Sequence, residues 1–186
     1  NEVTKTLEIL DTLVSFETTN TKSNLELIDF VEKFLVQFEF RVTRLHAPCG
    51  TKAGIYAEIG PAIEGGLLLS AHSDVVTVEG QKWTYPPFKL TTAGDRYYGR
   101  GTTDMKGFLA SMLALASRIN DKKLSKPLAL LISYDEEIGC VGLQQMKAQL
   151  APLLRAPQLC IVGEPTEMKI ALGHKGKTAY RATFTG

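Results

Sequence analysis

Residues 67–74 read LLLSAHSD, an apolar run that leads into His72 and Asp74, whose side chains are of types that bind metal ions. Two later runs have the same form, since residues 128–137 read LALLISYDEE and residues 159–164 read LCIVGE. Apolar runs this short, bounded by glycine and proline, are typical of strands that are buried on both faces of a largely parallel sheet, with helices on each side. We therefore predict an α/β fold with three buried strands that end in ligand-type side chains.

The ends of these three strands predict a metal site. In an open α/β sheet, ligands bind outside the carboxyl ends of the strands. His72, the pair Glu136 and Glu137, and Glu164 all follow a predicted strand and would meet at that edge. Several carboxylates gathered beside one imidazole favour a bound cation, because buried charge without a partner is costly.

Helical periodicity and turn signals predict the layers around this sheet. Apolar residues three and four positions apart predict helices, and short apolar stretches between turn signals predict strands. The order strand, helix, strand, helix, strand implies right-handed crossovers in one parallel-rich sheet, which gives a three-layer αβα domain. Residues 83–98 predict a loop with a short hairpin near 93–95. The predicted helices are 2–16, 24–38, 105–119 and 141–150, and two strands at 41–45 and 54–59 precede the first buried run.

The last residues of the sequence have a different pattern. Residues 177–184, KTAYRATF, alternate in polarity, which predicts a half-buried strand of antiparallel character. We expect this strand to open a second, truncated domain. Residues 1–176 would then form an incomplete catalytic domain, and residues 177–186 would begin the second one.

Composition narrows the class of protein. The chain has 186 residues, of which 44% are hydrophobic, so it can bury a substantial core. Its 21 basic and 20 acidic residues leave a net charge of +1, which gives no electrostatic attraction to nucleic acid or to an anionic membrane surface. The sequence has neither a leader pattern nor an apolar stretch of about 18 residues that could span a bilayer. These features favour a soluble cytoplasmic protein.

The cysteines carry no metal or disulfide signal. Cys49, Cys140 and Cys160 are odd in number, far apart and without CxxC spacing. We therefore expect reduced thiols.

Each candidate residue also has a structural interpretation. A single histidine after an apolar run is more often a hydrogen-bonded core residue than a ligand. Asp74 changes that balance for His72, because a carboxylate two residues away can accept the second ring N–H and orient the imidazole. Glu164 precedes Pro165 and could be a turn residue, although its place after the third strand favours a ligand.

The remaining acidic residues also allow two interpretations. Adjacent glutamates usually form a solvated turn, but on an extended backbone Glu136 and Glu137 point to opposite sides, so one can bind metal while the other acts as a base. Asp104 lies directly before a predicted helix and could be its N-cap. Its two oxygens could instead bridge two cations, which sit about 3.5–4 Å apart in two-metal hydrolases. The glycines around it lack the GxxxxGK[ST] spacing of a phosphate-binding loop.

Four motifs, in this order and spacing, resemble one family over nearly the whole chain. They are AHSDVV at 71–76, YGRGTTDMKGF at 98–108, SYDEEIG at 133–139 and VGEPT at 162–166. Together they are similar to the amino-terminal half of the acetylornithine deacetylase and succinyl-diaminopimelate desuccinylase family of dinuclear zinc amidohydrolases. Four separated motifs are far more specific than any one of them.

The resemblance implies a two-zinc centre and a role for each candidate residue. It also implies that the Asp104–Met105 peptide is cis. Zinc fits a shell of imidazole and carboxylates, in which cobalt or manganese could replace it. The implied arrangement has His72 and Glu164 on one zinc, Asp104 between the two and Glu137 on the other, with Glu136 as general base and acid and Asp74 as the residue that orients His72.

The resemblance further implies hydrolysis of the amide bond of a small N-acyl amino acid. His174-Lys175-Gly176 and residues 83–88 are most similar to the branch that converts N2-acetyl-L-ornithine to L-ornithine and acetate in arginine biosynthesis. Desuccinylase, aminoacylase and carboxypeptidase activities stay open, as does a non-catalytic metal-binding module. This sequence has Pro86-Pro87-Phe88 where relatives have Asp-Pro-Phe, so Pro86 cannot take the role of that aspartate.

Family members complete the second zinc site with a later histidine and form homodimers through a lid domain. Both features are expected after Gly186. The resemblance therefore implies a weak second metal site and little or no turnover by residues 1–186 alone.

Overall fold

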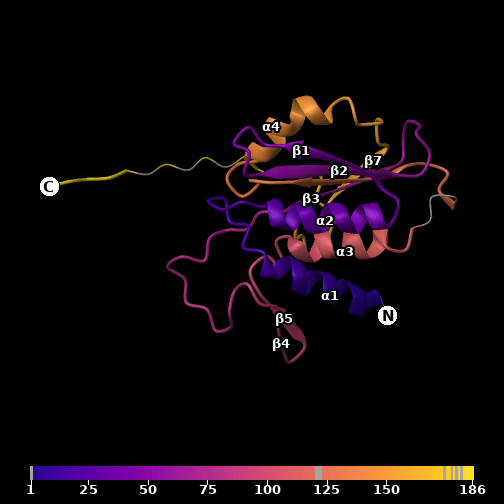
Figure 1. The fold of residues 1–186 in the computed structure, drawn as a ribbon. Coiled ribbons are helices and arrows are strands. Elements are labelled where there is room, and N and C mark those ends of the chain that lie inside the picture. The colour runs from indigo at the N-terminus through magenta and orange to yellow at the C-terminus, as the bar shows by residue number, and fades with distance from the viewer. Residues whose placement is uncertain (1, 120–122, 174, 177, 179, 181) are drawn as a thin grey trace.

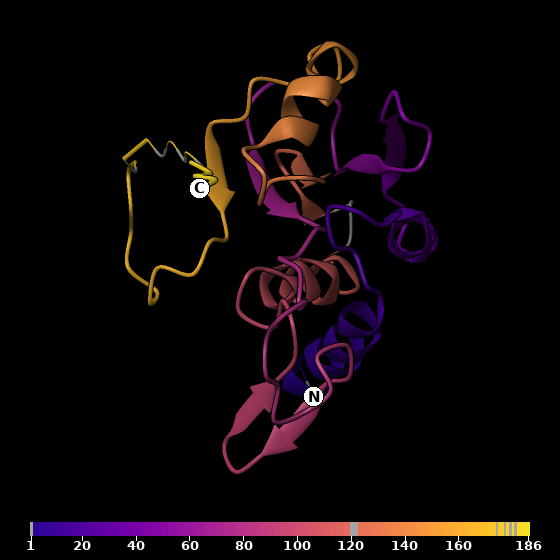
Figure 2. The same ribbon diagram turned by 90° about the vertical axis from the view of Figure 1, so that its left-hand side faces the viewer.

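The fold has three layers, with one mixed sheet between two layers of helices (Figures 1 and 2). The computed structural model describes residues 2–119, 123–173, 175–176, 178, 180 and 182–186. Helices α1, α2 and α3 lie on one side of the sheet, and α4 lies on the other. The elements in chain order are α1 (Glu2–Ser15), α2 (Leu25–Gln37), β1 (Arg41–His46), β2 (Ala53–Ile59), β3 (Leu67–His72), β4 (Thr91–Ala93), β5 (Arg96–Tyr98), α3 (Lys106–Ala116), β6 (Leu128–Ser133), α4 (Val141–Leu150) and β7 (Leu159–Val162).

The main sheet confirms the predicted parallel-rich α/β architecture. Its strand order is β1-β2-β6-β3-β7, in which β3 runs parallel to both β6 and β7. β1 and β2 add antiparallel pairs at the other side of β6. His72 lies opposite Ser133, and Ser70 lies opposite Val162, so the three parallel strands end at the same edge. This register brings the residues that follow each strand to one place.

The predicted helices form with small changes at their ends. α2 buries Leu27, Ile28, Val31 and Leu35, a spacing that places them on one face of a helix. α3 is shorter than the predicted range 105–119, since it begins at Lys106 and ends at Ala116. The hairpin expected near residues 93–95 is formed by β4 and β5.

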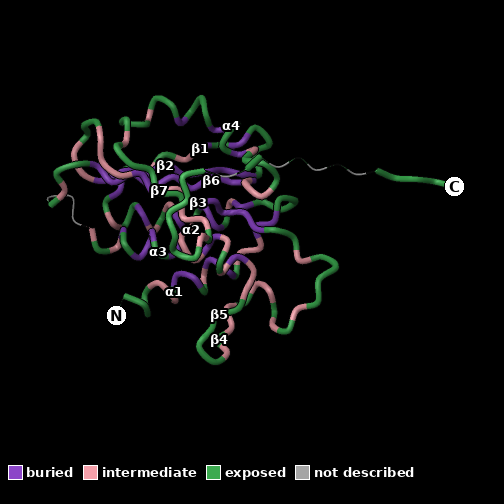
Figure 3. The backbone as a smooth tube through the Cα atoms, turned by 180° about the vertical axis from the view of Figure 1, so that it is seen from behind, coloured by how far each residue is buried: buried purple, intermediate pink, exposed green. Residues whose placement is uncertain are grey.

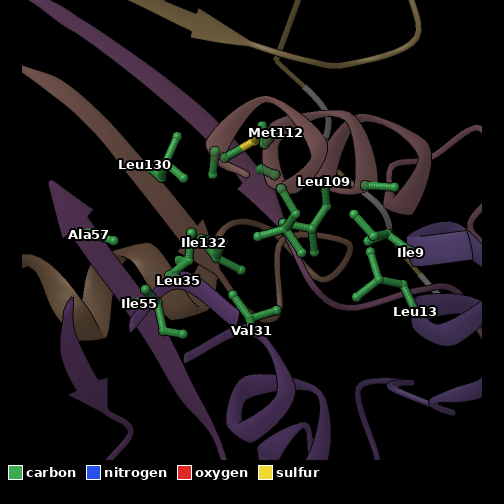
Figure 4. Packing of buried hydrophobic residues seen from close by; sticks show 14 of the residues in the cluster. Ile9, Leu13, Val31, Leu35, Ile55, Ala57, Leu109, Met112, Leu130 and Ile132 are labelled. Carbon is green, nitrogen blue, oxygen red and sulfur yellow. The ribbon is translucent and has the colours of Figure 1, made fainter. Parts of the chain in front are cut away.

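Two hydrophobic clusters hold the layers together. The larger cluster joins α1, α2 and α3 to one face of the sheet, where Leu13, Val31, Leu109 and Ile132 are fully buried (Figure 4). The smaller cluster joins α4 to the other face and contains Met146. The main sheet is therefore covered on both faces at its centre, as continuous apolar strands require.

The prediction that the third apolar run is buried is wrong for this structure. Among the described strands β7 lies at the edge of the sheet and pairs with β3 alone, and all four of its residues are exposed (Figure 3). Leu159 and Val162 are each 57% exposed. An apolar run shows that a strand can be buried, but burial also needs a neighbouring element, and the described helices leave the side chains of β7 open.

The predicted strand over residues 177–184 does not form in the part of it that the structure describes. Thr178, Tyr180 and residues 182–186 have no strand structure, and Tyr180 and Phe184 are each 93% exposed. Residues 182–186 lie away from the sheet (Figure 1), and no described strand pairs with the described residues of this segment. Residues 177, 179 and 181 lie outside the described residues. The division into two domains at residue 177 stays a prediction.

Cys49, Cys140 and Cys160 are free, as expected. None of the helices in the described ranges is long and apolar enough to cross a membrane.

We expect Ile132→Ala to lower the free energy of unfolding by about 2–5 kcal/mol, because it removes a fully buried side chain from the centre of the sheet. Urea denaturation followed by circular dichroism measures this loss. Val36→Ala is the control, because Val36 is 57% exposed on α2 and its truncation should change stability by less than about 0.5 kcal/mol. Equal effects of the two substitutions would contradict the described core.

Candidate metal centre

His72 is the centre of a cluster of carboxylates at the carboxyl edge of the sheet. It is the last residue of β3 and is 1% exposed. Its Nε2 atom lies 3.1 Å from Asp104 Oδ1, 3.7 Å from Glu164 Oε1 and 3.8 Å from Glu136 Oε2. Three segments far apart in the sequence therefore place carboxylate oxygens around one ring nitrogen.

The ligand-type atoms form two overlapping groups. His72, Glu136 and Glu164 have one ligand atom each within 4.8 Å of one another, and so do His72, Asp104 and Glu137. The structure thus brings together all of the predicted ligands. Glu136, which is predicted to be the base, also belongs to one of these groups, so its carboxylate lies close enough to His72 to share a metal ion with it. The predicted division of these residues between two metal ions stays a prediction.

Asp74 contacts the imidazole through two of its atoms. His72 Nδ1 lies 3.0 Å from the main-chain oxygen of Asp74 and 3.4 Å from its Oδ1. Both the main chain and the carboxylate of Asp74 therefore lie next to the ring nitrogen, and the orienting role of Asp74 stays a prediction. Asp74 Oδ2 accepts a hydrogen bond of 3.0 Å from the main-chain N–H of Glu137, which ties the turn after β3 to the turn after β6.

Asp104 does not act as the helix N-cap. Met105 occupies that position, and α3 has no side-chain cap hydrogen bond. The Asp104–Met105 peptide is cis, as the resemblance implied. Asp104 keeps a side chain that is 46% exposed and faces His72. Its carboxylate is thus available to a cation or a substrate.

Burial and negative charge compete at His72. Burial lowers the pKa of His72, but Asp74, Glu164 and Glu136 outweigh that effect and raise it to about 9. The same carboxylates therefore favour positive charge at the ring position.

Crowding of the carboxylates disfavours the charged form of the neighbouring glutamates. Burial and the Asp104 carboxylate raise the pKa of Glu137 to about 7. Burial and Asp104 also raise the pKa of Glu164. Carboxylates so close to one another resist ionisation unless a positive charge lies among them.

The donor set fits a divalent metal with mixed nitrogen and oxygen ligands. Imidazole and carboxylate suit zinc, cobalt and manganese. Among the residues that the structure describes, none forms a hydrogen bond with the buried Oδ1 of Asp74, which lies 3.4 Å from His72 Nδ1. A histidine that binds metal through Nε2 would donate its Nδ1 proton to Asp74, as histidine ligands usually do to a carboxylate or carbonyl.

A buried network of hydrogen bonds supports the turn after β3. Ser73 is fully buried, and both its N–H and its hydroxyl donate to the carbonyl of Ser133, each at 2.9 Å. Thr18 donates to the Ser73 carbonyl at 2.6 Å, and the amide of Asn24 donates to the Ser73 hydroxyl at 3.0 Å. The segment between α1 and α2 thus fixes the residue between His72 and Asp74.

Sequence reasoning missed these supporting residues. Thr18 and Asn24 lie in the polar stretch ETTNTKSN at 17–24, which is typical of a solvated connection. Lys106 was missed too, although its side chain is fully buried and Nζ donates to the Phe16 carbonyl at 2.7 Å. Burial lowers the pKa of Lys106 to about 7. The density of polar residues was a signal, but burial depends on contacts that only folding creates. His174 lies outside the described residues.

The fold and site together define a class: an α/β protein with a carboxylate-rich candidate metal centre at the carboxyl edge of its sheet. Residues 68–181 match the model of peptidase family M20/M25/M40. The chain belongs to this family.

Curated relatives extend the match over the whole chain. The chain is 36% identical over 185 residues to acetylornithine deacetylase of Buchnera aphidicola subsp. Acyrthosiphon pisum (strain Tuc7), covering 100% of this chain and 48% of the relative. It is 43% identical over 135 residues to acetylornithine deacetylase of Aliivibrio fischeri (strain MJ11), covering 73% of this chain and 35% of the relative. The chain thus spans about half the length, or less, of the curated relatives that it matches.

Solved structures share the fold. An M20 family metallo-carboxypeptidase, Sso-CP2 from Sulfolobus solfataricus, superposes with a TM-score of 0.74 at 26% identity, covering 86% of this chain and 37% of that one. Human carnosine dipeptidase 1 superposes with a TM-score of 0.69 at 21% identity, covering 86% of this chain and 38% of that one. The predicted α/β class and the family resemblance are both confirmed.

In the chelator-treated protein, we expect the contribution of Glu137 to the free energy of unfolding to fall as the pH rises from about 4.5 to about 7. The folded-state pKa of Glu137, about 7, lies above its ordinary value of 4.5, so the folded protein binds more protons in this window, and that advantage disappears as the pH rises. Glu137→Gln should make the free energy of unfolding fall less steeply across the window, as measured by urea denaturation. Glu79→Gln, on an exposed loop, should behave like wild type. Parallel pH profiles for Glu137→Gln and wild type would count against the described environment.

Proposed function

We propose that this chain supplies the catalytic metal centre of a hydrolase that cleaves the amide bond of an N-acyl amino acid. The observation that carries the proposal is the convergence of His72, Asp104, Glu137 and Glu164 with Glu136 at one sheet edge. Membership of a peptidase family and relatives named acetylornithine deacetylase support it.

We propose zinc as the metal, in two positions, with cobalt as a possible substitute. When bound, the metal supplies Lewis acidity, which polarises a substrate carbonyl and lowers the pKa of water. The proposed ligands are His72, Asp104, Glu137 and Glu164, and Asp74 orients His72 through its Nδ1 atom.

Glu136 is the proposed general base and acid. Its side chain is 37% exposed, so water and substrate can reach the carboxylate. It accepts a proton from the attacking water as the water oxygen bonds to the amide carbon. The same proton then passes to the nitrogen of the leaving amine as the C–N bond breaks. Cys140 Sγ donates to Glu136 Oε1 at 3.5 Å and leaves Oε2 facing His72.

The substrate that we propose is N2-acetyl-L-ornithine, which would give L-ornithine and acetate. The names of the curated relatives support this choice. The dipeptidase and carboxypeptidase names among similar folds make related acyl amino acids and peptides the competing substrates. We further propose that the whole protein completes the second metal site and adds a lid that forms a homodimer in the cytoplasm. Residues 1–186 alone should then turn over little substrate.

Turnover of N2-acetyl-L-ornithine by the full-length protein should exceed turnover of N-succinyl-diaminopimelate when both are measured as kcat/KM. The acyl group and amine are the parts of the substrate that change, while every residue at the metal centre keeps its role. Comparable or higher kcat/KM for the succinyl substrate would refute the proposed substrate but leave the metal centre intact.

Glu136→Gln in the full-length protein should lower kcat by about 10²–10⁴-fold, because it removes the proton-transfer group. Bound zinc, measured by elemental analysis, should stay at the wild-type level. Glu167→Gln, on an exposed loop after the centre, is the matched control and should leave kcat unchanged. If Glu136→Gln keeps wild-type kcat, another group serves as the base. If the wild type itself shows no turnover while binding zinc, the protein is a non-catalytic metal-binding module.

A further inference from the structure

A buried ion pair lies next to the turn that contains Glu136 and Glu137. Lys52, directly before β2, is 7% exposed, and Asp135, two residues after β6, is 9% exposed. Lys52 Nζ pairs with Asp135 Oδ1 and also donates to the Asn20 carbonyl at 2.7 Å. The pair joins three segments at the edge of the sheet where the candidate metal centre lies.

The strand register places the two partners together. β2 and β6 are antiparallel, with Ile55 opposite Ile132. The start of β2 and the end of β6 therefore meet at one edge, and continuing the register by three residues brings Lys52 opposite Asp135. The ion pair extends the sheet contact past the last paired residues of β6.

Asp135 has a backbone conformation that needs support. Its φ angle is +52°, in the left-handed region that residues other than glycine rarely adopt. Burying two charges gains little stability over apolar packing, because both partners lose their hydration. A pair of this kind is better explained by the conformation that it fixes.

The turn after Asp135 is closed by hydrogen bonds and reaches the metal centre. The Asp135 carbonyl accepts from the N–H of Val141 at 3.0 Å, and the Glu136 carbonyl accepts from the N–H groups of Gly139 and Cys140 at 2.8 and 2.9 Å. Moving Asp135 would therefore move the whole turn, including the two glutamates whose carboxylates lie near His72.

We propose that Lys52 is a positioning residue, whose ion pair with Asp135 fixes the turn so that the carboxylates of Glu136 and Glu137 meet His72. This proposal rests on the proposed metal centre. Lys52 acts on the centre through Asp135, and its hydrogen bond to the Asn20 carbonyl holds the ammonium in place.

The test compares Lys52→Met and Lys52→Arg in the full-length protein, with Co2+ as the probe. Lys52→Met should weaken Co2+ binding at least tenfold in calorimetric titration and change the visible absorption spectrum of bound Co2+, which reports ligand geometry. Lys52→Arg keeps the positive charge and should restore the spectrum. If Lys52→Met does not fold, Asp135→Asn replaces it, because this variant removes the ion pair at nearly constant shape.

Arg41→Met is the matched control, because Arg41 forms an ion pair of 2.6 Å with the buried Glu58 at the opposite end of β2. It should lower stability to urea without changing the affinity or spectrum of Co2+. The proposal is overturned if Lys52→Met or Asp135→Asn lowers stability in the same way and leaves both Co2+ readouts at wild-type values. Failure of the wild type to bind Co2+ any better than His72→Ala would overturn it together with the metal centre. If Lys52→Met weakens Co2+ binding and changes its spectrum but the wild type hydrolyses no amide, only the proposed activity is refuted.

Discussion

The parallel pairing of β3 with both β6 and β7 is the constraint on which the candidate centre depends. Because all three strands point the same way, the residues that follow them emerge at a single edge. His72 ends β3, the two glutamates follow β6, and Glu164 follows β7. A shift of one strand by one residue would turn its side chains to the other face and disperse the cluster.

Electrostatic repulsion is the cost of this arrangement. The raised pKa values of Glu137 and Glu164 arise from burial and from the Asp104 carboxylate. The folded chain therefore holds negative groups closer together than their mutual repulsion favours, and the apolar packing on both sheet faces maintains them there. Such conflict between local stability and arrangement is typical of functional sites, where a bound cation relieves it.

Hydrogen bonds next to the site hold the turns that follow β3 and β6 in one arrangement. Ser73, between His72 and Asp74, is held by Thr18 and Asn24. On the other side, the N–H of Glu137 donates to Asp74, so that the two site-bearing turns contact each other directly. These interactions link the α1–α2 connection, which bears none of the proposed ligands, to the placement of the proposed ligands.

The sequence alone determined the strand order along the chain, the helices between the strands and the identity of the candidate ligands. The strands and helices follow from local pattern, and an apolar run such as LLLSA ends at a candidate ligand, His72. Asp104 instead precedes a helix, and the complete set of ligands rests on the resemblance of the four motifs to one family. Only the tertiary structure decided that β7 is an exposed edge, that the main-chain oxygen of Asp74 shares the His72 contact, and that Lys52 lies beneath the turn after β6. The physical reason is that burial, pairing and support depend on residues distant in sequence, and no local pattern records which distant residue will be adjacent after folding.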